Sequence, residues 1–251
     1  MSIVSELEHD STVLRITLDR PKANVLDTAM MGAIEEAIRG VDAHVKAIVF
    51  DHAGPHFSFG ASVEEHTAER APDMLARFHG LFRTLAELAI PTAALVRGCC
   101  LGGGLELASF CTWLCVAPNA KLGQPEIKLA VFPPMASLVL PWRIGAGRAM
   151  DLCVSGRTVD AEEALRIGLA SAIADDPAAW WDTFFSEHLE ASSAAALRFA
   201  ERAVRADLIE GLAKRIPELE RLYVDELMKT HDANEGIRAF IAKEKPAFED
   251  R

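Results

Sequence analysis

Two glutamates and a run of three glycines are the residues best suited to carry chemistry in this sequence. The glycines, Gly102 to Gly104, follow an apolar run opened by Pro91, and helical spacing of apolar residues resumes after them. This pattern predicts a strand that turns into a helix. Glycines at such a junction leave backbone N–H groups free, and the positive end of the helix dipole lies behind them. The junction is therefore a predicted site for a negatively charged oxygen.

The two glutamates lie close to this junction in the predicted order of elements. Glu106 falls in the first turn of the predicted helix, and Glu126 follows twenty residues later in a Gly-Gln-Pro-Glu turn. Two carboxyl groups beside an anion site suit acid–base catalysis on a substrate whose carbonyl becomes an enolate. The alternative is purely structural: the glycines allow close packing of helix and strand, and both glutamates are solvated, Glu106 as a partner of the helix dipole.

The elements that would position these residues alternate along the first half of the chain. Strands are predicted where apolar residues alternate or run together, and helices where they recur every three or four residues. The expected strands are 13–18, 46–50, 90–96 and 113–117, and the expected helices are 28–41, 72–88 and the residues directly after Gly104. Asp27 is the expected N-cap of the first helix. The alternation predicts an α/β fold built on a layered sheet.

The second half is predicted to be mainly helical, with few strands beyond Pro134. Helices are expected at 146–154, at 161–167 behind an Asp160 cap, and from Pro177 to the end, with breaks near 191–193, Gly211, Pro217 and His231. Several leucines and one isoleucine of this half form apolar faces that we expect to need partners: Leu208, Leu212, Ile216, Leu219 and Leu222. We therefore expect an α/β core at 1–190 and a C-terminal helical region at 191–251.

Composition excludes several classes of function. A formal net charge of −11 argues against a general binder of nucleic acids or anionic membranes, because such proteins present a basic field. The five cysteines show neither a disulfide framework nor paired zinc spacing, so we expect them to be reduced. The longest apolar stretch, 129–142, contains three prolines and is too short to cross a bilayer. With no secretory signal at the start, a cytoplasmic location is expected.

A pair of histidines raises the question of a metal site. His52 and His56 are four residues apart in a predicted loop. No carboxylate or cysteine ligand set accompanies them in the sequence, and two imidazoles alone rarely hold a metal ion. We therefore expect no metal.

Taken together, the motifs resemble those of the crotonase family, the enoyl-CoA hydratase/isomerase superfamily. The family signature matches 98–108, which holds the glycines and Glu106, and 121–126, which ends at Glu126. Further matches are at 19–23, 57–61 and 235–240, so the resemblance covers nearly the full length. It implies a crotonase-like layered sheet core with helices and a C-terminal helical region.

The resemblance also implies roles for particular residues. The carbonyl oxygen of a CoA thioester would lie between the backbone amides of Ala61 and Gly103, the oxyanion hole of the family. Glu106 and Glu126 occupy both positions of the hydratase pair, one activating water and the other carrying the proton. Isomerases of the family commonly keep only one of the two, so the pair favours hydration.

Further substrate contacts and the assembly are implied in the same way. The residues that match positions near the acyl group or the CoA nucleotide in relatives are Lys22, Ala23, Phe59, Gly60, Ser62, Gly102, Pro134, Lys245 and Phe248. Taken singly, each lysine could equally be an ordinary surface residue. Because CoA belongs to the substrate, no metal, flavin or nicotinamide cofactor is expected. Relatives form trimers that pair into hexamers, so a homotrimer or homohexamer is expected.

One position departs from the family pattern. Ordinary short-chain enoyl-CoA hydratases have a glycine eight residues after the second glutamate, and its N–H helps to hold the water; this sequence has Pro134 there. Proline has no N–H to donate. The stretches 57–66 and 131–134 look most like those of the cyclohexa-1,5-diene-1-carbonyl-CoA hydratases, enzymes of anaerobic aromatic degradation. The alternatives are a general enoyl-CoA hydratase, an enoyl-CoA isomerase, and a binding protein of this fold that has lost catalysis.

Overall fold

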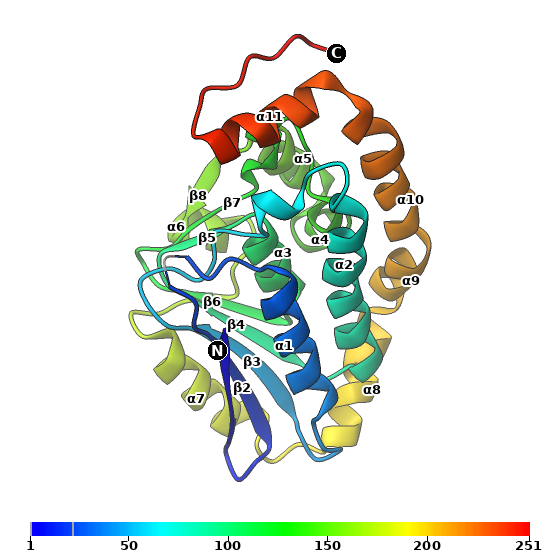
Figure 1. Ribbon diagram of the computed structural model, residues 1–251. Helices are drawn as coiled ribbons and strands as arrows, with labels where there is room; N and C mark the ends of the chain where they lie inside the picture. Colours follow the sequence, from blue (N-terminus) through cyan, green and yellow to red (C-terminus); the bar gives the residue numbers. More distant parts are fainter. Residues whose placement is uncertain (1, 22) are drawn as a thin grey trace.

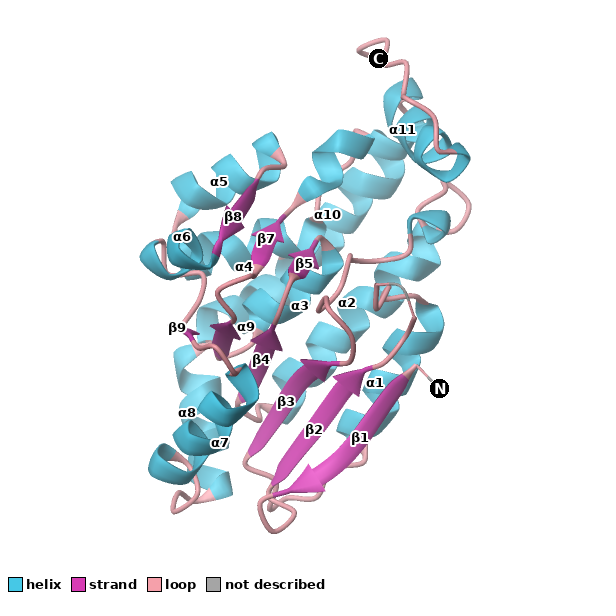
Figure 2. Ribbon diagram, turned by 90° about the vertical axis from the view of Figure 1, so that its left-hand side faces the viewer, coloured by secondary structure: helices cyan, strands magenta, loops and turns pink. Residues whose placement is uncertain are grey.

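A six-stranded sheet forms the base of the molecule in the computed structural model, which describes residues 2–21 and 23–251. Its strands, in spatial order, are β1 (Ile3–Glu8), β2 (Val13–Leu18), β3 (Ala47–His52), β4 (Thr92–Val96), β6 (Trp113–Val116) and β9 (Ala172–Ile173). The edge strand β1 is antiparallel to β2, and the other neighbours are parallel. The four strands expected from the sequence are present, and β1 joins them as a strand that the pattern analysis missed (Figure 2).

Helices cover both faces of this sheet, as its fully buried central strands require. Alternate strand residues face opposite sides: Phe50 and Val96 belong to the main hydrophobic core, whereas Val49 and Ala93 pack against Trp181. The main-core face is covered by α1 (Thr28–Arg39) and α2 (Ala71–Leu88), and the opposite face by α7 (Pro177–His188) (Figure 1). Asp27 caps α1 as expected, accepting a hydrogen bond from the Met30 N–H at 2.9 Å.

A second sheet of three short strands lies beside the first and carries the glycine turn. Its order is β5 (Cys99–Leu101), β7 (Lys121–Gly123) and β8 (Thr158–Asp160), with β5 and β7 parallel. Leu101 pairs with Gly123, so the residues that follow these two strands leave the sheet side by side. The glycine turn and the turn that carries Glu126 are therefore neighbours. The sequence analysis did not find this sheet, because three-residue strands show no periodicity.

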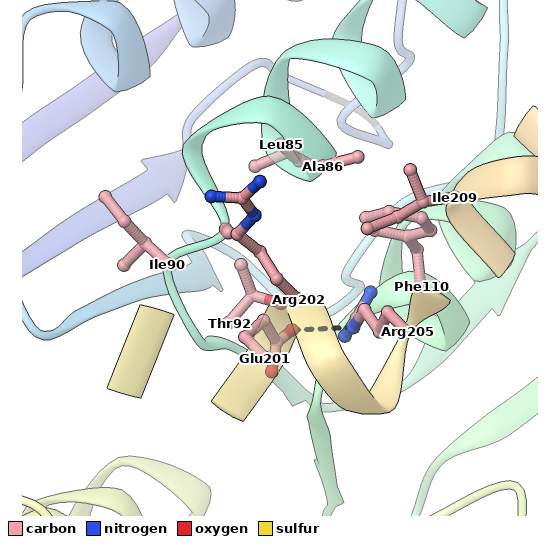
Figure 3. A pocket seen from close by; sticks show the side chains of 10 residues that line it. Leu85, Ala86, Ile90, Thr92, Phe110, Glu201, Arg202, Arg205 and Ile209 are labelled. Carbon is pink, nitrogen blue, oxygen red and sulfur yellow. Dashed lines mark ion pairs between the residues drawn. The ribbon is translucent and has the colours of Figure 1, made fainter. Parts of the chain in front are cut away.

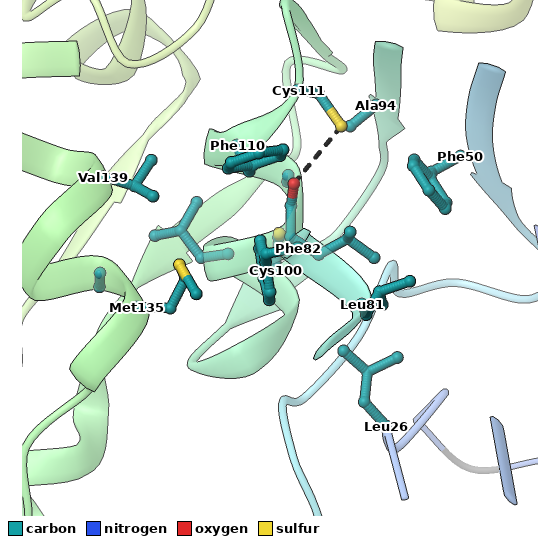
Figure 4. Close-up of a cluster of buried hydrophobic side chains, with 14 of the residues drawn as sticks. Leu26, Phe50, Leu81, Phe82, Ala94, Cys100, Phe110, Cys111, Met135 and Val139 are labelled. Atoms are coloured by element: carbon teal, nitrogen blue, oxygen red, sulfur yellow. Dashed lines mark hydrogen bonds between the residues drawn. The ribbon is translucent and has the colours of Figure 1, made fainter. Parts of the chain in front are cut away.

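The remaining helices enclose the two sheets. They are α3 (Gly103–Phe110), α4 (Pro134–Ile144), α5 (Ala146–Ser155), α6 (Ala161–Arg166), α8 (Ala194–Val204), α9 (Ala206–Lys214), α10 (Ile216–Arg221) and α11 (His231–Ala242). The regular elements within 191–251 are all helical. They include a short π-helix, Leu222–Glu226, directly after α10. Figure 4 shows buried side chains of the main core contributed by α2, α3 and α4, among them Phe82, Phe110 and Met135. Among the described residues, no helix is both long and apolar enough to cross a membrane.

In the second half, one predicted helix break is wrong and one helix was not predicted. The predicted break at Gly211 is wrong, because Gly211 lies inside α9. Its missing side chain makes room for α4: a Cβ atom there would lie 2.7 Å from Leu138 Cδ1. No helix was expected directly after Pro133, yet this stretch forms α4, with Pro134 at the first helical position, where no N–H is needed.

Candidate active site

One cavity of about 400 Å³ gathers most of the predicted site residues. The cavity is lined by residues of α2, the glycine turn, the start of α4 and α11. These elements meet above the centre of Figure 1. Its lining is mainly apolar, as is usual for small-molecule sites. The predicted residues in the lining are Phe59, Gly60, Ala61, Gly102, Gly103, Glu106, Glu126 and Pro134.

The glycine turn places two backbone amides next to each other. A Cβ atom on Gly103 would lie 3.0 Å from the Ala61 nitrogen, so these two backbone segments are in contact. Neither amide donates a hydrogen bond within the described part of the chain. Gly103 is the first residue of α3, so the positive end of the helix dipole adds to its N–H. Two free donors at one place can hold an anionic oxygen.

Backbone hydrogen bonds fix the loop that carries Ala61. The Leu26 N–H donates to the Gly60 carbonyl at 2.9 Å, and the Ser62 N–H donates to the Leu26 carbonyl at 3.3 Å. On the other side, the Leu101 N–H donates to the Ser58 carbonyl at 2.9 Å, which ties this loop to β5. The separation of the two amides is therefore set by backbone contacts and does not depend on mobile side chains.

Glu106 projects from the first turn of α3 and is 4 % exposed. Its Oε1 accepts a hydrogen bond from the Ala136 N–H at 2.7 Å, in the first turn of α4. Burial raises the pKa of Glu106 to about 7, and the backbone bonds from Ala136 and Met135 partly oppose this shift by favouring the ionised form. A carboxyl group with a pKa near 7 is suited to take up or release a proton at neutral pH.

Glu126 lies in the short 3₁₀ helix Pro125–Leu129, and its carboxylate reaches the glycine turn. A Cβ atom on Gly102 would lie 2.8 Å from Glu126 Oε1, and the backbone there has φ +51°, so glycine suits both the space and the conformation. With its amide nitrogen toward Glu126, the buried Gln124 donates to both carboxylate oxygens, at 3.0 and 3.1 Å. Burial, and then the neighbouring charge of Glu106, raise the pKa of Glu126 well above its ordinary value.

The two glutamates form a coupled pair with unequal environments. Burial favours the protonated form of both carboxyl groups; the helix amides oppose this effect at Glu106, and the charge of Glu106 adds to it at Glu126. Two carboxyl groups that can exchange protons near neutral pH therefore face one cavity, beside two amides that can stabilise a carbonyl oxygen as it gains charge. This arrangement can remove a proton from one atom of a bound carbonyl compound and supply a proton to another.

Comparison with known proteins assigns the chain to a family. Residues 8–251 match the family model described as enoyl-CoA hydratase/isomerase. The chain belongs to the enoyl-CoA hydratase/isomerase family. This membership confirms the predicted crotonase fold and the prediction of an enzyme, a hydro-lyase that acts on CoA thioesters.

Individual relatives match along nearly the whole chain. A cyclohexa-1,5-dienecarbonyl-CoA hydratase of Thauera aromatica is 46% identical over 98% of this chain and 96% of the relative. A probable enoyl-CoA hydratase of Mycobacterium bovis is 38% identical over 98% of this chain and 97% of its own length. Among solved structures, an enoyl-CoA hydratase from Mycobacterium avium subsp. paratuberculosis superimposes with a TM-score of 0.86 at 26% identity, covering 100% of this chain and 99% of the other.

Other residues that the enoyl-CoA hydratase resemblance pointed to lie outside the cavity lining. Ala23 lines a separate hollow of about 160 Å³, and its carbonyl accepts a hydrogen bond from the Phe59 N–H at 3.0 Å. Lys245 and Phe248 are exposed in the segment after α11. The Ser62 carbonyl accepts a hydrogen bond from His66 Nδ1 at 2.7 Å. Lys22 lies outside the described residues. The predicted contacts of these residues with substrate stay predictions.

Three parts of the site were missed by the sequence analysis. Gln124 lies in the turn that carries Glu126 and donates to its carboxylate. A polar side chain two residues before a candidate buried glutamate could have indicated this contact from the sequence. The Ala136 N–H reaches Glu106 because α4 begins at Pro134, a helix that was not expected from the sequence. Tyr223 also lines the cavity, although it is almost one hundred positions from Glu126 and no local pattern marks it.

The two histidines considered as metal ligands have structural roles instead. His52 Nε2 accepts a hydrogen bond from the Arg97 N–H, and His56 Nδ1 accepts one from the Cys99 N–H, both at 3.1 Å. Burial and the nearby Arg97 lower the pKa of His52 to about 4, so its ring is neutral and can accept this bond. Both rings thus hold the segment that leads into the glycine turn.

A second hollow, between α2, α8 and α9, is too small for a substrate. It encloses about 10 Å³, roughly the space that one water molecule needs. Its lining includes Glu201 and Arg205, which form an ion pair at 2.6 Å (Figure 3). This ion pair joins α8 to the start of α9 and lies apart from the cavity that holds Glu106.

Proposed function

We propose that this enzyme adds water to a conjugated dienoyl thioester of CoA, converting cyclohexa-1,5-diene-1-carbonyl-CoA to 6-hydroxycyclohex-1-ene-1-carbonyl-CoA in aromatic degradation. The observation that carries the proposal is the meeting of Glu106, Glu126 and the free amides of Ala61 and Gly103 at one cavity. Support for the ring substrate comes from the 46% identity with a relative named for that substrate.

In the proposed reaction, the thioester oxygen accepts hydrogen bonds from the Ala61 and Gly103 amides. Ionised Glu106 takes a proton from water as the water oxygen bonds to the ring β carbon. The electrons of the double bond move toward the thioester oxygen, which gives a dienolate that the two amides stabilise. Protonated Glu126 then supplies a proton to the γ carbon, so that water has been added 1,4. The mechanism uses no metal, flavin or nicotinamide.

The cavity wall next to the glutamates supports a cyclic acyl group. Phe132, Pro133 and Pro134 lie together in the lining. Proline side chains are rigid rings, and Phe132 packs against Tyr223 with ring centroids 5.4 Å apart, so this wall has little freedom to reshape. Because Pro134 supplies no N–H, this wall gives the substrate an apolar surface where ordinary hydratases offer a donor.

The substrate proposal is tested by comparing catalytic efficiencies. We expect kcat/KM for cyclohexa-1,5-diene-1-carbonyl-CoA to exceed that for crotonyl-CoA by at least about tenfold, which corresponds to about 1.4 kcal/mol of differential transition-state binding. Equal or better efficiency on crotonyl-CoA would identify a general enoyl-CoA hydratase. Double-bond migration without water uptake would identify an isomerase, and inactivity on every thioester a non-catalytic binding protein.

We also propose that the protein assembles into a homotrimer or a dimer of trimers. Of the apolar residues expected to need partners, Leu208, Leu212 and Ile216 are buried within the chain itself, so for these three the expectation is wrong. Leu219 is partly buried, and Leu222 remains exposed. Other large apolar side chains also stay exposed, among them Met150 and Val154 on α5 and Phe199 and Val204 on α8. Exposed apolar side chains that lie together often mark protein interfaces. Sedimentation at assay concentration should show a trimer or hexamer, and a fully active monomer would refute the proposal.

A further inference from the structure

The π-helical segment after α10 brings one aromatic side chain into the active-site cavity. Tyr223 lies in the π-helix Leu222–Glu226, part of the orange segment between α10 and α11 in Figure 1. It is 1% exposed and lines the cavity together with Glu106 and Glu126. Its ring packs against Phe132 at an interplanar angle of 60°. Short π-helical segments are rare and occur often at functional sites, because they change which residue a helix directs inward.

The Tyr223 hydroxyl is buried and has no hydrogen-bond partner among the described residues. Buried hydroxyl groups in native proteins are nearly always paired, since an unpaired one costs free energy. An unpaired hydroxyl at a substrate cavity is therefore expected to find its partner in a bound molecule. Burial and the charges of Glu126 and Glu106 raise the pKa of this phenol, so it keeps its proton and acts as a donor.

Each other group at the site already has a defined partner in the proposed hydration. The Ala61 and Gly103 amides bind the thioester oxygen, and the two carboxyl groups interact with hydrogen atoms that move. The oxygen of the added water needs a hydrogen-bond donor to fix its position, and Pro134 in the cavity wall has no N–H. Tyr223 is a neutral donor, and it is near enough to both glutamates for their charges to raise its pKa.

We propose that the Tyr223 hydroxyl donates a hydrogen bond to the oxygen of the water that is added, and so to the hydroxyl oxygen of the product. This assignment rests on the proposed hydration. Tyr223 keeps its own proton throughout: Glu106 accepts the proton of the water, and Glu126 supplies the proton to carbon. The hydroxyl aligns the water oxygen with the β carbon, and the Phe132 contact holds the ring that carries it.

Replacing Tyr223 with Phe tests this assignment, because Tyr223→Phe removes the hydroxyl and leaves the ring contact with Phe132. We expect kcat for the preferred thioester to fall about tenfold to a hundredfold, the range for one hydrogen bond to an oxygen that gains negative charge, as the water oxygen does when Glu106 takes its proton. KM should stay within about twofold, since the thioester and CoA contacts remain. Thermal stability of the free protein should not fall, because the hydroxyl that is removed has no partner.

Thr84→Val is the matched control, since it also removes one buried hydroxyl. The Thr84 hydroxyl is paired, with Arg39 at 2.7 Å and Glu35 at 3.0 Å, and it lies on α2 outside the cavity lining. We expect this variant to lose thermal stability and to keep kcat. The opposite pattern in the two variants would distinguish a hydroxyl that acts on the reaction from one that only holds the fold.

Several outcomes would overturn the assignment while leaving the proposed hydration intact. The first is an unchanged kcat in Tyr223→Phe, and the second is a loss of thermal stability in Tyr223→Phe like that of the control variant. The third is a shift of more than about half a pH unit in the acidic limb of its pH–rate profile, which would show that the hydroxyl acts on a glutamate. If the wild-type protein hydrates no enoyl thioester, the proposed hydration itself fails, and the role of Tyr223 fails with it.

Discussion

Glu106→Gln and Glu126→Gln each lower kcat for thioester hydration by about 10² to 10⁴, the range for a positioned acid or base. Glutamine keeps the shape of the side chain and can still accept the Ala136 N–H, but it cannot exchange the proton that the reaction moves. Binding of a CoA thioester should persist in both variants, because the Ala61 and Gly103 amides are unchanged. Initial rates together with calorimetric titration of a saturated acyl-CoA measure the two effects separately.

Glu201→Gln supplies the control for replacing a buried glutamate. Glu201 has a pKa raised by burial, as Glu106 and Glu126 do, but it is paired with Arg205 in the small hollow of Figure 3. This variant should lose stability and keep kcat. Near wild-type hydration in Glu106→Gln or Glu126→Gln would show that the role assigned to that residue is wrong.

The pH dependence of the same reaction follows from the unequal environments of the pair. Glu106 must be ionised to accept a proton, and its pKa is raised to about 7, so kcat/KM should fall as the pH drops through 7. Glu126 must be protonated, and burial and the charge of Glu106 raise its pKa well above its ordinary value, so activity should also fall at alkaline pH. The two limbs belong to the coupled pair and not to either residue alone.

The parts of this site that follow one another in the chain could be predicted from the sequence. The apolar run of β4, the glycines and the spacing of Glu106 all carry local signals, and the structure has β4, the short unpredicted strand β5, the glycine turn and α3 in that order. The pairing of β5 with β7, which brings Gly102 to Glu126, could not be predicted, because three-residue strands gain their stability from tertiary contacts. For the same reason nothing local marked Tyr223, which the fold brings to the cavity from the C-terminal helices.

Gly103→Pro should lower kcat by about 10² to 10³, the loss typical for one donor of an oxyanion hole. The donor is a backbone amide, so only proline removes it without changing a neighbouring residue. Proline is tolerated at the first position of a helix, and Gly103 is the first residue of α3, so the helix can still begin there. Turnover of the preferred dienoyl thioester in the purified, folded variant measures this loss.

Gly103→Ala separates the missing N–H from the added side chain. A Cβ atom at this position lies 3.0 Å from the Ala61 nitrogen and 3.2 Å from Phe78 Cζ, so both variants crowd the oxyanion hole and the wall beside it. Alanine keeps the N–H, and we expect it to lose less activity than proline by at least about tenfold. Equal losses in the two variants would assign the effect to crowding, and a folded Gly103→Pro protein with wild-type kcat would remove this amide from the mechanism.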